Sequence, residues 1–268
     1  MSRARVYKTE AIIIRHQDFG EADKIITLYT PYIGKITAIA KGVRRPKSRM
    51  GGHLDLLTRS NLLAAQGKNL DIITQAHLID SFAPLKAELW RLSCGLYAAE
   101  LVHRFTPERL PHASLYNLFT VTLERLGKYD KGELVLRFFE MRLLDLMGYR
   151  PELRKCSSCS GVIQPGPNYF SSAAGGVVCE ECHSARPLPN DRAVSVNAVK
   201  VLRVLQGESF ETAVCLKLGR ELASELDYVL RSFITYILEQ EIRSTGWLDT
   251  LRRLENTVSP GLSPPGTP

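Results

Sequence analysis

Four of the six cysteines in this 268-residue chain form two Cys-x-x-Cys pairs in one short segment. The pairs are Cys156 with Cys159 and Cys179 with Cys182, and 19 residues separate them. Two residues between cysteines allow a tight turn that directs both sulfurs at one ion, and a hairpin-sized insert brings the second pair round to complete a tetrahedron. The spacing therefore predicts one zinc ion held by four thiolates.

The predicted zinc site is structural rather than catalytic. A hydrolytic zinc keeps one position open for water, whereas four thiolates close the shell. His183 directly follows Cys182, but four sulfurs suffice, so we expect it not to bind the ion. The two other cysteines, Cys94 and Cys215, lie in helical patterns beside apolar residues and are predicted to be small buried side chains.

Motifs for other chemistry are missing from the chain. It has no phosphate-binding G-x-x-x-x-G-K-[ST] loop, no G-x-G-x-x-G, no G-x-S-x-G and no histidine with glutamate two residues later, as a base deaminase requires. The sequence therefore predicts a protein that is not an enzyme. A metalloenzyme is the least favoured hypothesis, because it fits a closed sulfur shell poorly.

A second feature is a strongly basic stretch at residues 41–49. It carries Lys41, Arg44, Arg45, Lys47 and Arg49 with no acid among them. Residues 1–80 hold 13 Lys or Arg against 7 Asp or Glu, so they account for +6 of the formal net charge of +7. A basic segment beside a nearly neutral remainder is typical of a surface for a polyanion. These five residues and Lys35 are our predicted DNA contacts; a merely solvated loop is the alternative.

The segment that contains the basic stretch has the pattern of a β-barrel. Runs rich in Ile, Leu, Val and Thr cover residues 7–17, 23–30, 34–42, 56–65 and 70–79, with turn-forming residues between them. Five short strands suit a small closed barrel, because a sandwich generally needs about seven or more. We predict an OB-type barrel, with an SH3-like barrel as the alternative. Four aromatic residues could be core or base-stacking side chains: Tyr7, Phe19, Tyr29 and Tyr32.

After residue 84 the apolar residues recur every three or four positions, which is the spacing of a helix. Helices are predicted over residues 84–105, 113–127, 132–148, 195–206 and 219–244, and Gly127 and Gly148 are expected as C-caps. The predicted fold class is a multidomain α+β protein. Its parts are an OB-fold nucleic-acid-binding domain (1–80), an α-helical domain (81–255) with the zinc module inserted at about 151–190, and a disordered tail (256–268) rich in proline.

The chain shows no membrane or secretion signal. No apolar run approaches the roughly 18 residues of a membrane span, and the first apolar stretch is too short for a signal peptide. We therefore expect a cytoplasmic protein, whose thiols stay reduced and can bind metal.

The order of these parts resembles the RecO family of bacterial recombination mediators. The strings that carry the likeness are AKGVRRPKSR, GLYAAELV, RFFEMRLLDLMGYRPEL followed at once by CSSC, and YFSSAAGGVVCEEC. The likeness runs from about Tyr7 to about Ile242 and leaves out only the tail. Some members of this family lack the cysteines, so the chain resembles a zinc-bearing version.

The resemblance implies a DNA-binding protein without a catalytic centre or small-molecule substrate, associated with the nucleoid. Such proteins bind single- and double-stranded DNA, anneal complementary strands and, with RecR, help to load RecA onto DNA coated by single-strand-binding protein. They recognise the acidic C-terminal tail of that protein, which needs an apolar groove with cationic neighbours. Arg137 matches the arginine of the family's LRxFE helix and, with Arg142, is our candidate for this contact. The alternative is a zinc-stabilised OB-fold protein that binds RNA or acts as a scaffold.

Overall fold

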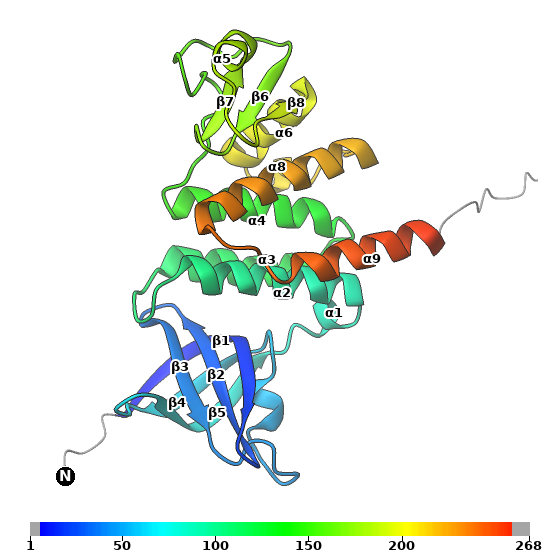
Figure 1. The fold of residues 1–268 in the computed structure, drawn as a ribbon. Coiled ribbons are helices and arrows are strands. Elements are labelled where there is room, and N and C mark those ends of the chain that lie inside the picture. Colours follow the sequence, from blue (N-terminus) through cyan, green and yellow to red (C-terminus); the bar gives the residue numbers. More distant parts are fainter. Residues whose placement is uncertain (1–5, 259–268) are drawn as a thin grey trace, which may run out of the picture.

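The computed structural model describes residues 6–258, and the side chains of residues 6–251. A β-barrel forms one end of the molecule, helices are stacked on it, and a small sheet lies at the opposite end (Figure 1). None of the described helices is long and apolar enough to cross a membrane. The predicted α+β fold class, with an N-terminal barrel followed by helices, is confirmed.

The barrel consists of the five predicted strands. They are β1 (Val6–Phe19), β2 (Asp23–Thr30), β3 (Gly34–Ala40), β4 (Arg59–Ala65) and β5 (Asp71–Asp80). The strand order is β1-β2-β3-β5-β4, and β1 also pairs with β4, which closes the barrel. Strand β5 pairs parallel to β3 and antiparallel to β4, a Greek-key arrangement of the OB type. A short 3₁₀ helix, η1 (Gly51–Leu54), precedes β4.

Side chains on β1 divide between two cores. Ile13 is directed into the barrel with Ile26, Leu28 and Ile36, as the two-residue period of a strand requires. Its neighbour Ile12 has the opposite orientation and packs with the helices. The barrel therefore shares apolar contacts with the helical region and is not an isolated module.

Eight helices of the described chain lie in the helical region beside the barrel. They are α1 (Ala83–Lys86), α2 (Leu89–Phe105), α3 (Ala113–Lys128), α4 (Gly132–Leu146), α6 (Val196–Gly207), α7 (Phe210–Ala213), α8 (Arg220–Leu238) and α9 (Thr245–Val258). The single helix predicted over residues 84–105 is two helices, because Glu88 has an extended backbone. The helix α9 was not predicted. Apart from residues 256–258, which end α9, the predicted tail lies outside the described residues.

The two glycines expected as C-caps have different roles. Gly148 follows α4 with a φ of 81°, in the left-handed region that glycine tolerates, so this prediction is confirmed. The prediction for Gly127 is wrong, because α3 continues through it. A Cβ atom at Gly127 would lie 3.2 Å from the backbone nitrogen of Leu85, so the glycine allows α1 to approach α3 closely.

The cysteine segment forms a small three-stranded sheet. Its elements are β6 (Asn168–Ser171), β7 (Gly176–Cys179), α5 (Glu180–Ala185) and β8 (Arg192–Val194). Strands β6 and β7 form the predicted hairpin, and β8, which was not predicted, adds to the free edge of β6. The sheet packs on the helices through Phe170, whose ring lies 5.5 Å from that of Phe233 on α8.

Candidate metal centre and nucleic-acid interface

The structure brings the four predicted cysteine ligands together. Their sulfur atoms all lie within 4.8 Å of one another, and Cys159 Sγ is 4.0 Å from Cys179 Sγ. Metal–sulfur bonds of about 2.3 Å in a tetrahedron place the sulfurs about 3.8 Å apart. The donor set and its geometry therefore fit a metal ion bound by four thiolates.

The backbone around Cys156 favours the thiolate that a metal requires. The amides of Ser158 and Cys179 donate to its sulfur, each at 3.4 Å. Burial raises the pKa of the Cys156 thiol, but donation from the backbone of Cys159, Cys179 and Ser158 outweighs it and lowers the pKa to about 6. Local backbone geometry thus favours the thiolate of Cys156.

The two cysteine pairs are held against each other by close backbone contact. Gly176 on β7 forms a β-bridge with Glu152, just before the first pair. A Cβ atom at Gly176 would lie 2.2 Å from the Glu152 carbonyl oxygen, so no other residue fits without a shift of the backbone. This contact places the end of β7, with Cys179, beside the turn that carries Cys156.

The remaining thiols and the nearby histidine lie outside the metal cluster. His183 stacks on Tyr169, with ring centroids 3.6 Å apart, and its Nδ1 is 3.1 Å from Asp191 Oδ2, which agrees with its expected exclusion from the ligand set. Cys94 is buried as predicted. The prediction for Cys215 is wrong: α7 ends at Ala213, and Cys215 follows it with an exposed side chain.

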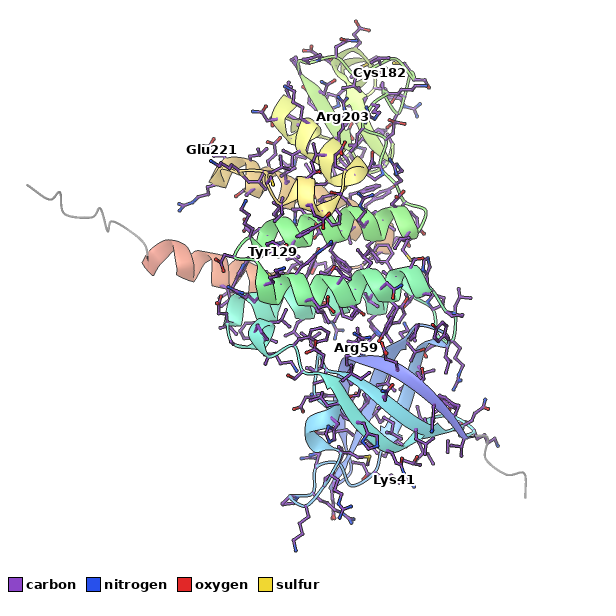
Figure 2. The ribbon with its side chains drawn as sticks, turned by 180° about the vertical axis from the view of Figure 1, so that it is seen from behind. Lys41, Arg59, Tyr129, Cys182, Arg203 and Glu221 are labelled. Atoms are coloured by element: carbon purple, nitrogen blue, oxygen red, sulfur yellow. The ribbon has the colours of Figure 1, made fainter. Side chains whose placement is uncertain are left out.

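The basic stretch forms a loop at the end of the barrel away from the helices, where Figure 2 labels Lys41. Val43 anchors the loop in the barrel core. The amide of Gly42 donates to Asp23 Oδ1 at 2.7 Å, and the amide of Arg44 donates to the Ala22 carbonyl at 2.9 Å. The loop is therefore attached to the β1–β2 turn.

The five cations of this loop are exposed at the surface of the barrel. Arg44 pairs with Asp18 at 3.3 Å. The other four, Lys41, Arg45, Lys47 and Arg49, form no ion pair with any residue that the structure describes. The loop thus presents a concentration of uncompensated positive charge to solvent.

Lys35 does not belong to this surface, so its expected role is corrected. Its side chain is only 7% exposed, and Nζ donates to the His103 carbonyl oxygen at 2.7 Å. Burial lowers the pKa of Lys35, while nearby Glu108 acts in the opposite direction. The loop that follows α2 covers the start of β3, so this lysine joins the barrel to the helices instead of facing a phosphate.

The four aromatic residues of the barrel differ in how far they are exposed to solvent. Tyr7 is half-buried and donates to Asp71, and Tyr29 is fully buried beside Tyr116 of α3. Phe19 and Tyr32 are 49% and 81% exposed. Only these two have faces on which a base could stack, and Phe19 lies at the β1–β2 turn to which the basic loop is attached.

The proposed partner contact at Arg137 and Arg142 is also corrected by the structure. Arg137 is 2% exposed and ion-paired with Glu140 and Asp227 at 2.9 and 2.7 Å. Arg142 donates to the backbone carbonyls of Gln206, at 2.9 Å, and Glu208. Arg137 is therefore not available to a peptide, whereas Arg142 is half-buried with its guanidinium engaged by these two carbonyls.

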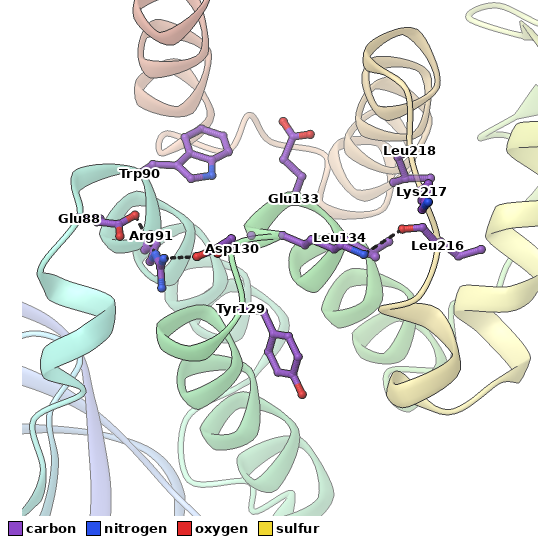
Figure 3. A pocket seen from close by; sticks show the side chains of 12 residues that line it. Glu88, Trp90, Arg91, Tyr129, Asp130, Glu133, Leu134, Leu216, Lys217 and Leu218 are labelled. Carbon is purple, nitrogen blue, oxygen red and sulfur yellow. Dashed lines mark hydrogen bonds and ion pairs between the residues drawn. The ribbon is translucent and has the colours of Figure 1, made fainter. Parts of the chain in front are cut away.

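A cavity that the sequence did not indicate lies between α2, the start of α4 and the loop before α8 (Figure 3). It has a volume of about 750 Å³. Its apolar lining comes from Trp90, Tyr129, Leu134, Leu216 and Leu218, and its charged lining from Glu88, Arg91, Asp130, Lys131, Glu133 and Lys217. This size suits a ligand or a short peptide end.

The barrel, the basic loop and the four-cysteine module together define a class of protein: an OB-type barrel joined to a helical region that carries an insert with a four-cysteine cluster able to hold a metal ion. The family model described as "Recombination protein O N terminal" matches residues 1–82, and the one described as "Recombination protein O C terminal" matches residues 87–246. The chain therefore belongs to the RecO family, and this membership supports a role in DNA repair.

Curated relatives extend over nearly the whole chain. The DNA repair protein RecO of Dehalococcoides mccartyi (strain CBDB1) is 42% identical over 253 residues, which is 94% of this chain and 98% of the relative. The DNA repair protein RecO of Roseiflexus sp. (strain RS-1) is 38% identical over 96% of this chain and 90% of its own. That of Pelotomaculum thermopropionicum is 36% identical, covering 91% and 94%.

Proposed function

We propose that this protein is a non-enzymatic mediator of recombinational DNA repair that binds single- and double-stranded DNA through its barrel. The observation that most directly supports this proposal is the basic loop 41–49. It presents five exposed cations, of which only Arg44 is ion-paired within the described chain. Such a loop on an OB barrel neutralises backbone phosphates without reading sequence. Two strands held in this way repel each other less, so complementary strands can anneal.

The experiment that tests this proposal is a gel shift with the charge-reversed double variant Arg44→Glu and Arg45→Glu. We expect it to retain neither single- nor double-stranded DNA, because each reversal replaces an attraction to phosphate by a repulsion. A matched control reverses Arg186 and Arg220, which are exposed on other parts of the molecule. Equal retention by the loop variant and the wild type would contradict the proposal, and stronger binding of RNA than of DNA would favour an RNA-binding role.

The metal of the cysteine cluster is proposed to be one structural zinc ion. Four thiolates are the donor set that zinc takes in closed structural sites. Bound zinc would hold the two cysteine pairs together and so stabilise the small sheet on α6 and α8. The chain's own residues add to this attachment, since Arg203 and Gln206 of α6 donate to the carbonyls of Leu153 and Pro151.

We assign the protein partners to the helical region. With RecR, the protein would help to load RecA onto DNA coated by single-strand-binding protein, in the cytoplasm and at the nucleoid. Because Arg137 and Arg142 are occupied, the cavity beside Trp90 replaces them as the proposed site for that protein's acidic tail. Aromatic and leucine side chains would receive an apolar tail end, and the exposed Lys217 would attract the acidic part.

A further inference from the structure

A second pocket, lined by three arginines, lies where the barrel meets the helices. It has a volume of about 530 Å³. Its walls come from three distant parts of the sequence: Ile14 and Arg15 of β1; Leu96, Glu100, His103 and Arg104 of α2; and Leu238, Gln240 and Arg243 from the end of α8 and the segment after it. Neither the basic loop nor the metal centre contributes a residue to it.

A β-bulge explains how two consecutive residues of β1 line this pocket. Ile13 pairs with Leu28 and Arg15 pairs with Thr27, so Ile14 is an extra residue without a partner of its own. A bulge places neighbouring side chains on the same face of a strand and often redirects one toward a functional site. Here it allows Ile14 to pack with the helices while Arg15 beside it lines the pocket.

The acid in the pocket is already used by structural bonds. Glu100 accepts from Arg104 Nε at 3.0 Å and from the backbone amides of Arg243 and Ser244 at 3.0 and 2.8 Å. These bonds outweigh the effect of burial and lower the pKa of Glu100, so it stays ionised. Among the described residues, the side chains of Arg15 and Arg243 have no ion-pair partner.

The pKa of His103 is affected by the positive charges of the same region. Burial lowers its pKa, and the charges of Lys35, Arg15 and Arg104 lower it further. Its Nδ1 is buried and lacks a hydrogen-bond partner within the described chain. Arg104 is itself bonded to Glu100 and Gln240. Within the described chain, Arg15 and Arg243 are therefore the cations of the pocket that are free to bind a ligand. Such a site attracts an anion that accepts several hydrogen bonds.

We propose that this pocket binds a phosphate group of a nucleic-acid backbone, as a second contact on the strand that the basic loop holds. Arg15 lies three residues before Asp18, the partner of Arg44, which is about 10 Å along a strand. One strand of DNA carries a phosphate about every 3.4 Å of helix axis, so a few nucleotides cover this separation. The inference rests on the proposed DNA binding and extends it to the junction with the helices.

The test uses the full chain with Arg15→Gln and Arg243→Gln and a fluorescent single-stranded oligonucleotide, whose anisotropy is measured against salt. We expect affinity to fall on the order of tenfold or more. The slope of log affinity against log salt should become shallower by about 0.7, because the contact with one phosphate is lost. The lysine variants Arg15→Lys and Arg243→Lys should restore most of the slope. Inorganic pyrophosphate should compete with the oligonucleotide in the wild type, and an RNA oligonucleotide should show the same dependence.

The outcomes separate this inference from the proposed function. An unchanged slope in the glutamine variant, while Arg44→Glu with Arg45→Glu abolishes binding, overturns the junction site and leaves DNA binding by the loop intact. Unchanged binding in both variants overturns both. An equal loss in the charge-matched control Arg186→Gln with Arg220→Gln also overturns the inference. Loss of binding to an acidic peptide with DNA binding retained would assign the pocket to a protein partner instead.

Discussion

Arg137 of α4 and Asp227 of α8 form a buried ion pair with 2.7 Å between Nη1 and Oδ1. The same guanidinium contacts Glu140 at 2.9 Å, and Tyr97 of α2 donates to that carboxylate at 2.6 Å. Arg231 continues the network by pairing with Asp227. Three helices are therefore connected through charges that have almost no access to water.

Replacing Arg137 by Ala should destabilise the protein strongly. Burial raises the pKa of Glu140 and Arg137 acts in the opposite direction, so the variant leaves the buried carboxylate of Glu140 without its ion-pair partner. Breaking a buried pair from one side costs about 3–5 kcal/mol of unfolding free energy. Urea unfolding measures this loss. The control Arg150→Ala, at an exposed pair with Asp145, should change stability by less than about 1 kcal/mol. A small loss at Arg137, or weaker DNA binding by the folded variant, would contradict its structural role.

Replacing Cys156 by Ser should release the metal without removing DNA binding. Three thiolates leave the shell incomplete, so metal content measured by atomic spectroscopy should fall and the Tm should drop. Binding of DNA should persist, because the basic loop lies at the opposite end of the molecule from the cysteines (Figure 1). The control is the buried Cys94→Ala, which lies outside the cysteine cluster and should lower stability but keep the metal. Metal retention by Cys156→Ser would argue against a four-thiolate site.

The stability of the junction between barrel and helices should depend on the ionisation of Glu10. Burial acts to raise its pKa, but donation from Arg59 at 2.8 Å and from Tyr116 at 2.7 Å outweighs this and lowers it. A lowered pKa means that the stabilisation is fully present above the ordinary carboxyl pKa of about 4.3. It disappears as pH falls through the lower folded value.

Urea unfolding of the wild type and of Glu10→Gln between pH 3 and pH 7 measures this dependence. The wild type should be the more stable protein at pH 7, and the difference should shrink as pH falls below the ordinary carboxyl pKa toward the lowered folded pKa of Glu10. Glu208→Gln is the control, because its side chain is exposed and has no ion pair within the described chain. A stability difference that is constant with pH, or one that grows in acid, would exclude ionisation of Glu10 as its cause.

The strands and the metal cluster could be predicted because their signals are local. Strand β2 has the predicted bounds, since a run rich in Ile, Leu and Thr between turn residues defines it within eight positions. The cysteine spacing is likewise a local signal, because it is the spacing that lets four thiolates reach one ion. The helix α9 was not predicted, because it follows the predicted long helix closely and its sequence was assigned in part to the tail.

Burial of individual cations could not be predicted, because it depends on elements that are distant in sequence. From the sequence, Arg137 could lie on the exposed face of a helix, but in the structure α8 covers it. Lys35 is enclosed by the loop after α2, and Arg15 gains its position from a bulge that no composition signal marks. A sequence pattern shows that a helix or strand has a polar side, whereas only the packing shows whether water or another element lies there.

The salt dependence of DNA binding should identify the basic loop as an electrostatic site. If the loop and its neighbours contact about five phosphates, log affinity should fall against log salt with a slope near −3.5 for a single strand. Replacing Lys47 by Gln, an exposed residue without an ion pair in the described chain, should make that slope shallower by about 0.7. Fluorescence anisotropy over a series of salt concentrations measures both values. A slope near zero would exclude phosphate contact as the source of affinity.

The cavity beside Trp90 can be tested by fluorescence, since the chain has only two tryptophans. Trp247 is largely exposed, so Trp247→Phe should leave Trp90 as the single reporter without disturbing the fold. An acidic peptide with an apolar C-terminal residue should change the Trp90 emission, because its end would displace water from the indole. Lys217→Glu should weaken this binding on the order of tenfold, since it replaces an attraction to the acidic peptide by a repulsion. The same change at the exposed Lys200 of α6 should have little effect. Binding that leaves Trp90 emission unchanged would place the peptide elsewhere on the helical region.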